Sequence, residues 1–304
     1  MVLHGTLIGH VYRSANRRLV LRYEDAWRTR AGAFPLSLSM PLDEREHGHR
    51  ATSAFLSGLL PDDPNVVEFW ARLHGVSRYD AVKLLAHVGE DCAGAVQLVR
   101  PEDVDRVVGV WSAADTATFG DEIAIVLERY DRARSHGIVH RIHQEDMCQS
   151  LAIQPTRTYE SDGGPGLTGV ATLLARHSPD AMVDVARLFD ANILNWLVAG
   201  PDAHAKNYSI LHAEGPDHRL APLYDVITAL PYPRLAKGGA RLAMAVGGER
   251  AVGNQRRSLA GRGPSRRIAS WSRDRSHHGA RCADTCGDRA SHSTSGWQRG
   301  HARS

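Results

Sequence analysis

Apolar and polar positions alternate at the start of the chain, and the period then changes. The segments TLIGHVYR (6–13) and RRLVLRY (17–23) alternate on either side of a short polar turn, so the pattern predicts a β-hairpin. Apolar residues over 51–60 recur at helical spacing, and the prolines of LLPDDP end that helix. Two more short helices are expected over 66–74 and 79–88, before GEDCAGAVQLV returns to a strand.

The second half of the pattern mixes both periods. EIAIVLERYDR (122–132) predicts a strand, and HQEDMCQSLAI (143–153) predicts a short helix with His143 to Asp146 as its first turn. YESDGGPGL (159–167) predicts a turn. The strongest helical periodicity runs over 181–198. YSILHAEGPDHRLAPLYD (208–225) predicts two short strands around a Gly-Pro-Asp turn.

Composition adds an asymmetry that the net charge of +3 conceals. The chain has 304 residues, of which 42% are hydrophobic and 23% charged, which is typical of globular proteins. Residues 251–304 hold 11 arginines, 3 aspartates and few large apolar side chains, so we expect a disordered basic tail. Such a composition is also typical of a GC-rich gene translated out of frame.

Cellular location can be predicted from the cysteines and from the apolar runs. Four cysteines in a chain this long do not form a disulfide scaffold, which favours a reduced, cytoplasmic compartment. No run of 18 apolar residues is present, and the first residues lack the pattern of a signal peptide. We therefore expect no membrane partner.

Candidate chemistry concentrates between Asp202 and Asp225. Asp202 and Asn207 have the D-x-x-x-x-N spacing of a kinase catalytic loop, in which the aspartate accepts the substrate hydroxyl proton and the asparagine binds Mg²⁺. Asp225 follows two predicted strands and could hold Mg²⁺, while Lys206 could neutralise the transferred phosphoryl group. The same residues also fit a polar turn whose Asp and Asn side chains bond the backbone.

Two further patterns have structural alternatives. ERYDR (128–132) could be a kinase hinge, whose backbone pairs with adenine, but the residues alone favour an edge strand with solvated charges. Cys282 and Cys286 lie near histidines, but the histidine pair does not have the spacing of a zinc site and no core surrounds it. The basic tail fits nonspecific nucleic-acid binding less well than a solvated charged segment.

Taken together, several stretches resemble the HipA family of type II toxin–antitoxin serine/threonine protein kinases. They occur in the family's order: FPLSLSMPL, FLSGLLPDD, LLAHVGEDCAGAVQLV, VLERYDR, RIHQEDMCQSLAI, YESDGGPGL, DAHAKNYSI and LAPLYDVITALPY. The resemblance implies an α+β fold, with a small N-terminal α+β subdomain (1–100) and a kinase-like domain (123–250). Residues 101–122 stand in place of most of the kinase small lobe, and 251–304 form the tail.

The resemblance also implies roles for the residues of the candidate loop. Asp202 matches the catalytic aspartate, and His204 and Lys206 belong to the same catalytic loop. Asn207 and Asp225 match the metal-binding pair. ATP and Mg²⁺ are the implied ligands.

Hinge, partners and target follow from the same resemblance. Glu128 and Tyr130 match the residues that contact adenine. The implied partner is a HipB-like helix-turn-helix antitoxin, through which the protein reaches DNA indirectly. The implied protein substrate is of the aminoacyl-tRNA synthetase class.

Two departures from the family pattern bear on activity. Residues 100–122 are too few for a kinase small lobe, contain no lysine and show no phosphate-binding glycine motif. The basic tail replaces a helical C-terminal region, so the apolar face of the helix over 181–198 should be exposed. A noncatalytic remnant that binds the antitoxin is therefore the alternative to an active kinase.

Overall fold

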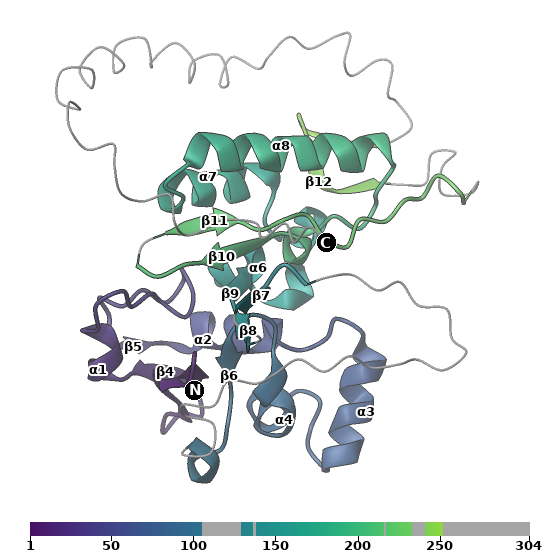
Figure 1. The fold of residues 1–304 in the computed structure, drawn as a ribbon. Coiled ribbons are helices and arrows are strands. Elements are labelled where there is room, and N and C mark those ends of the chain that lie inside the picture. The colour runs from purple at the N-terminus through teal and green to yellow at the C-terminus, as the bar shows by residue number, and fades with distance from the viewer. Residues whose placement is uncertain (105–128, 136–137, 216, 233–240, 252–304) are drawn as a thin grey trace, which may run out of the picture. The chain divides into compact units, whose positions relative to one another are not determined.

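The structure is a computed structural model and describes residues 1–104, 129–135, 138–215, 217–232 and 241–251 (Figure 1). Residues 1–253 form one compact unit. Residues 122–128 of the strand predicted over 122–132, the segment before them (105–121) and the basic tail beyond 251 lie outside the described residues. None of the helices in the described ranges is both long and apolar enough to span a bilayer.

Two small antiparallel sheets and four helices build the N-terminal part. One sheet has the order β2-β1-β6, from Thr6–Leu7, Val2–Leu3 and Val96–Gln97. The other has the order β3-β4-β5, from Gly9–Arg13, Leu19–Tyr23 and Glu46–His47. The helices are α1 (Asp25–Arg28), α2 (His49–Gly58), α3 (Pro64–His74) and α4 (Ala81–Val88).

The predicted hairpin is present and its alternation explains the fold of this part. Strands β3 and β4 pair from Gly9 with Tyr23 to Arg13 with Leu19. Leu19, Leu21 and Tyr23 face inward and are buried in the core, because successive side chains of a strand point to opposite faces. The Tyr23 hydroxyl donates to the carbonyl of Met40, so this buried polar side chain has a partner.

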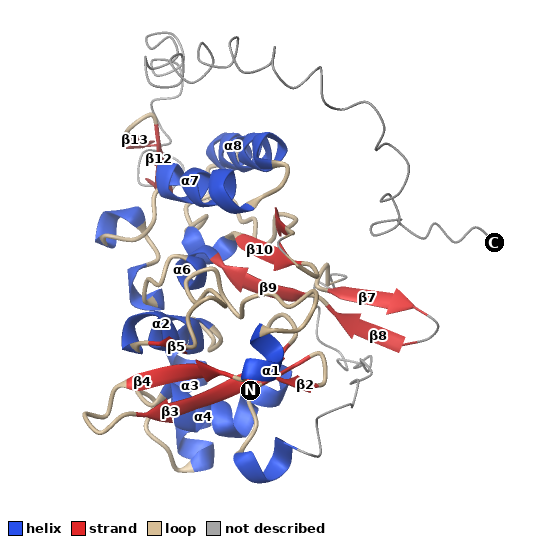
Figure 2. Ribbon diagram, turned by 90° about the vertical axis from the view of Figure 1, so that its left-hand side faces the viewer, coloured by secondary structure: helices blue, strands red, loops and turns tan. Residues whose placement is uncertain are grey.

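The second part is a three-stranded sheet with helices on one side. Its strand order is β11-β10-β9, from His218–Leu220, Ser209–His212 and His143–Asp146. Helices α7 (Leu167–His177) and α8 (Ala181–Leu197) lie side by side and contact β11 (Figure 2). The other α-helices and strands of the described residues are β7 (Arg132–Ser135), β8 (Ile138–Arg141), α6 (Met147–Ser150), β12 (Arg241–Val246) and β13 (Glu249–Ala251).

The prediction that His143 to Asp146 form the first turn of a helix is wrong. These four residues are strand β9, paired with β10 from Ser209 opposite Asp146 to His212 opposite His143. Three of the four residues are buried. The sequence therefore lacks the alternation of buried apolar and exposed polar residues that indicates a strand with one solvated face. Asp146 instead caps the short helix α6: its carboxylate accepts from the Gln149 backbone N–H, and the Gln149 side-chain oxygen accepts from the Asp146 backbone N–H.

Segment 34–42 joins the two parts. The Leu36 carbonyl contacts Nε2 of His143 at 2.8 Å, and the Leu38 N–H donates to the buried Glu145 carboxylate at 2.8 Å. The Phe34 ring stacks on both His143 and His212. Nε2 of His143 and one carboxylate oxygen of Glu145 therefore have partners in the first part, which couples the two parts in folding.

Candidate functional site

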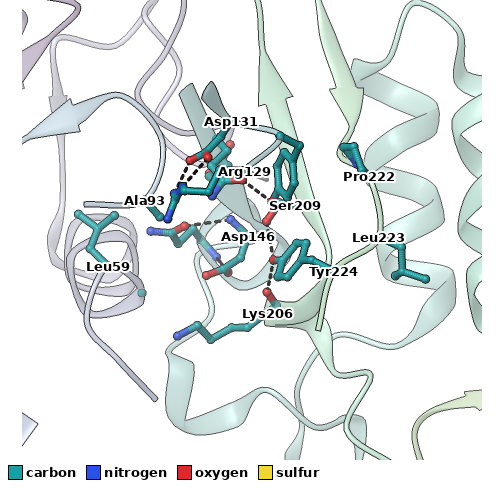
Figure 3. Close-up of a pocket in the computed structure, with 15 residues that line it drawn as sticks. Leu59, Ala93, Arg129, Asp131, Asp146, Lys206, Ser209, Pro222, Leu223 and Tyr224 are labelled. Atoms are coloured by element: carbon teal, nitrogen blue, oxygen red, sulfur yellow. Dashed lines mark hydrogen bonds and ion pairs between the residues drawn. The ribbon is translucent and has the colours of Figure 1, made fainter. Parts of the chain in front are cut away.

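A cavity of about 560 Å³ lies between the end of α2, strand β9 and the segment after β11 (Figure 3). Its walls come from both parts of the chain and carry two tyrosines, three carboxylates and one lysine. The lining residues are Gly58, Leu59, Ala93, Arg129, Tyr130, Asp131, Gln144, Glu145, Asp146, Gln149, Lys206, Ser209, Pro222, Leu223 and Tyr224. The cavity therefore contains two of the residues predicted from sequence, Tyr130 and Lys206.

The predicted catalytic loop, residues 202–207, follows α8, and a hydrogen bond joins its first and last residues. Its 3₁₀ turn spans Ala205–Asn207, and the Asn207 side-chain amide donates to the Asp202 carbonyl at 2.7 Å. The Tyr224 hydroxyl donates to the Lys206 carbonyl at 2.5 Å and lies 2.7 Å from the Ser209 hydroxyl. These bonds fix the backbone of the loop against β10 and the segment that carries Tyr224, so the loop has more than the local bonds of a polar turn.

Asp202 is held by a residue that the sequence interpretation did not single out. The Tyr159 hydroxyl donates to the Asp202 carboxylate. Burial, together with this bond to Asp202, raises the pKa of Tyr159 well above its usual value. His204 lies edge-on to the Tyr159 ring, with centroids 5.0 Å apart, and its Nε2 is 3.9 Å from the Asp202 carboxylate. The Tyr159 hydroxyl therefore bonds to the Asp202 carboxylate, the group that a catalytic base would use to accept a proton.

Lys206 is buried and its ammonium group forms an ion pair with Asp62 of the N-terminal part. Its side chain is 8% exposed, whereas that of Asp62 is 56% exposed. Asp146 lines the same cavity, and burial raises its pKa to about 7 against the opposing charge of Lys206. The site therefore combines one ammonium group with a carboxyl that titrates near neutral pH.

Tyr130 lies on the wall of the cavity beside a buried ion-pair network. Its hydroxyl donates to Gln144 at 2.5 Å, and burial raises its pKa to about 12. Asp131 accepts bonds from the side chains of Arg129 and Arg132 and from the Gly94 N–H. This network fixes the segment that the sequence predicted as a hinge. Its other predicted residue, Glu128, lies outside the described residues.

The predicted metal-binding pair is only partly assembled. Asp225 is exposed, adopts a left-handed φ of 52° and directly follows Tyr224 of the cavity wall. Asn207 is buried, and because its amide nitrogen is bonded to Asp202, its amide oxygen is the atom left for a cation. Within the described part of the chain, no group of three or more His, Cys, Asp or Glu side chains forms a metal site. The donor set is all oxygen, which suits Mg²⁺ shared with phosphates.

Four residues of the site escaped assignment from sequence: Asp62, Asp146, Tyr159 and Tyr224. Each lies in a stretch that resembles the family, namely FLSGLLPDD, HQEDM, YESDGGPGL and LAPLYD. The signal in the sequence that could have identified them is that these stretches contain polar residues. Their roles depend on contacts with residues up to 144 positions away, and spacing along the chain does not reveal such contacts.

The sequence of this chain matches family models and known relatives. A family model described as the HipA N-terminal domain matches residues 1–99, and one described as the HipA-like C-terminal domain matches residues 106–291. A Sinorhizobium fredii protein named "Putative kinase Y4mE" is 28% identical over 339 residues, covering 80% of this chain and 79% of the relative. A Haemophilus influenzae protein named "Putative kinase" is 24% identical over 119 residues, covering 38% of this chain and 33% of the relative.

The alignment with the Sinorhizobium protein is longer than this chain. Its 339 positions exceed the 304 residues present here, so the relative has residues without a counterpart in this chain. A structural comparison finds a chain of the Shewanella oneidensis MR-1 toxin–antitoxin complex of HipA, HipB and operator DNA. That likeness has a TM-score of 0.66 at 20% identity and covers 81% of this chain and 79% of the other. The fold is that of HipA, and the chain belongs to the HipA family.

Proposed function

We propose that this protein is a serine/threonine protein kinase that transfers the γ-phosphoryl group of ATP to a protein hydroxyl. The observation that carries the proposal is the joining of the Asp202–Asn207 loop to the cavity through Lys206, Ser209 and Tyr224. Relatives named as kinases support the same activity. By family resemblance, the target is of the aminoacyl-tRNA synthetase class.

In this mechanism Asp202 accepts the proton of the attacking hydroxyl. The hydroxyl oxygen bonds to the γ-phosphorus, the bond from that phosphorus to the bridging oxygen breaks, and ADP leaves. Lys206 donates to the terminal phosphate, where negative charge is highest. Asn207 and Asp225 would hold Mg²⁺, which when bound offsets the charge of the phosphates. The incoming hydroxyl takes the acceptor position at Asp202 that Tyr159 occupies.

A HipB-like antitoxin is the proposed partner, with DNA contacted through it. The structural neighbour is a chain of a complex of HipA, HipB and operator DNA, which supports this assignment. A noncatalytic antitoxin-binding protein is the second candidate. The exposed position of Asp225 and the residues that the Sinorhizobium relative has in excess favour it.

The melting temperature of the purified protein with and without Mg-ATP tests the proposal. Ligand at 100 times its Kd stabilises the folded state by about 2.7 kcal/mol, which gives a measurable rise in melting temperature. We expect this rise with Mg-ATP and a smaller one with ATP in excess EDTA. A folded protein with no rise would contradict nucleotide binding and would favour the antitoxin-binding candidate.

A further inference from the structure

The loop between α2 and α3 extends from the N-terminal part to the catalytic loop. Gly58 and Leu59, at the end of α2, line the cavity, and Asp62 pairs with the Lys206 ammonium group. Asp62 and Lys206 are 144 positions apart, so the pair joins two regions that the sequence separates widely. Asp62 is thus a residue of the N-terminal domain that contacts the proposed catalytic machinery.

The loop that carries Asp62 is fixed at both ends. At the α2 end, a Cβ atom on Gly58 would lie 2.6 Å from the Gln149 side chain, and Gln149 donates to the Phe55 carbonyl at 2.8 Å. At the α3 end, the Asp63 carboxylate caps the helix through the Asn65 N–H at 2.8 Å, and Pro64 occupies the first helical turn. The position of the Asp62 carboxylate is therefore set by the backbone on either side.

We propose that Asp62 is a positioning residue that holds the Lys206 ammonium group in the cavity, ready to donate to the terminal phosphate of ATP. This inference rests on the proposed kinase function. A lysine ammonium group has three donors, so one bond to Asp62 leaves two for phosphate oxygens. In protein kinases a lysine that binds phosphates is likewise held by a carboxylate.

The other carboxyl on the cavity wall is a poorer partner for Lys206. Burial raises the pKa of Asp146 to about 7, so this group is partly protonated at neutral pH. Its carboxylate also accepts from the Gln149 N–H as a helix cap. Asp62 is 56% exposed and has no second structural bond among the contacts of the described residues. The pairing of a buried ammonium group with an exposed carboxylate fits a positioning role.

A carbodiimide cross-link tests the contact itself. This reagent joins carboxylates to amines that are in direct contact, and peptide mass spectrometry locates the joined residues. We expect an Asp62–Lys206 cross-link in the wild type and in Asp63→Asn, and its loss in Asp62→Asn. Asp63→Asn is a matched control because it removes a charge one residue away while Asn remains a good helix cap. A cross-link of Lys206 to Asp146 or Asp202 alone, or none at Lys206, would overturn the pairing.

Nucleotide discrimination tests the role of the pair. In Asp62→Asn we expect the Kd for Mg-ATP to rise about fivefold, as for loss of one partly exposed ion pair. The Kd for Mg-ADP, which lacks the terminal phosphate, should stay within about twofold. Asp62→Glu should restore part of the preference for ATP, and Asp63→Asn should keep all of it. A purely structural role for Asp62 would weaken both nucleotides equally.

These outcomes separate this inference from the proposed function. If the wild type binds Mg-ATP but Asp62→Asn keeps the same ATP-to-ADP ratio, the role of Asp62 is wrong while the kinase proposal stands. Tighter ATP binding by Asp62→Asn would also contradict the role of Asp62, because Asp62 would then compete with the phosphate for Lys206. If the wild type binds neither nucleotide, both proposals fall.

Discussion

At the residue scale, the role of Asp202 can be tested against Asp190, because Asp190 and Asn195 have the same spacing as Asp202 and Asn207. Asp202→Asn keeps the shape and the bond acceptor for Tyr159 but cannot take a proton, so phosphotransfer should fall by about 10²–10⁴-fold. The rise in melting temperature with Mg-ATP should remain. Asp190, which is exposed on α8 and lies five residues before Asn195, provides the control Asp190→Asn. Equal activity in both variants would contradict the role of Asp202.

Asp146 gives a prediction about stability and pH. Its pKa is raised to about 7 in the folded state from a usual 3.8, because it is buried. The folded protein therefore binds more protons than the unfolded chain between these values. Asp146 contributes stability that is full below pH 3.8 and is lost as the pH rises through 7.

Removing this titration should change how stability depends on pH. Relative to the wild type, Asp146→Asn should gain stability from pH 5 to pH 7, by up to about 1.4 kcal/mol per pH unit. Urea denaturation across this range measures the difference. Asn retains the helix cap, and Asp180→Asn, at an exposed site, is measured alongside as the control for loss of a carboxylate. A constant difference between Asp146→Asn and the wild type would show that Asp146 is ionised in the folded state.

The sequence predicted the candidate catalytic loop but not its surroundings. Asp202 and Asn207 were singled out because a kinase catalytic loop has a fixed local spacing, and Lys206 because its charge could neutralise the phosphoryl group. Asp62 and Tyr159 were not assigned, because their contacts lie 144 and 43 positions away along the chain. Local patterns therefore predict a candidate catalytic loop, whereas the groups that hold it come from tertiary packing.

At the scale of elements, the predictions succeeded where one face of an element is solvated. The β3–β4 hairpin and helix α8 show clear periods because polar residues line their outer faces. Strand β9 was mistaken for a helix because it is buried on both faces and begins with polar residues that bond to segment 34–42. Helix α7 was not predicted. It begins at Leu167, directly after a glycine-rich turn.

Gly94 lies where the N-terminal domain touches β9, and it gives a prediction about packing. Its φ is +73°, and a Cβ atom there would lie 2.7 Å from the Gln144 backbone nitrogen. Gly94→Ala should lower the free energy of unfolding by about 2–5 kcal/mol through strain and overpacking together. Gly75→Ala is the matched control, with φ +64° and open space, and should cost about 1–2 kcal/mol. Chemical denaturation of both variants measures the difference, and equal losses would contradict the close approach.

At the scale of the whole molecule, helix α8 presents an apolar face to solvent. Its exposed apolar residues are Met182, Val183, Phe189, Ile193, Leu194 and Leu197. The sequence led us to expect such a face, and exposed apolar area of this kind promotes association. The double variant Ile193→Gln/Leu197→Gln should self-associate less in sedimentation experiments, with unfolding free energy changed by under about 1 kcal/mol.

The buried side of the same helix supplies the control. Leu188 is fully buried in the second core, so Leu188→Gln should destabilise the protein by about 2–5 kcal/mol. A similar loss from the Ile193/Leu197 variant would mean that this face is covered in solution.

The contact between segment 34–42 and β9 also has a consequence for synthesis on the ribosome. The Leu36 carbonyl and the His143 ring that meets it are 107 residues apart. At synthesis rates of about 5–20 residues per second, the first emerges about 5–20 s before its partner. During that interval the Phe34 ring lacks the histidines on which it stacks. The nascent N-terminal domain therefore exposes an apolar segment until β9 is made, and a chaperone that binds such segments would act in this window.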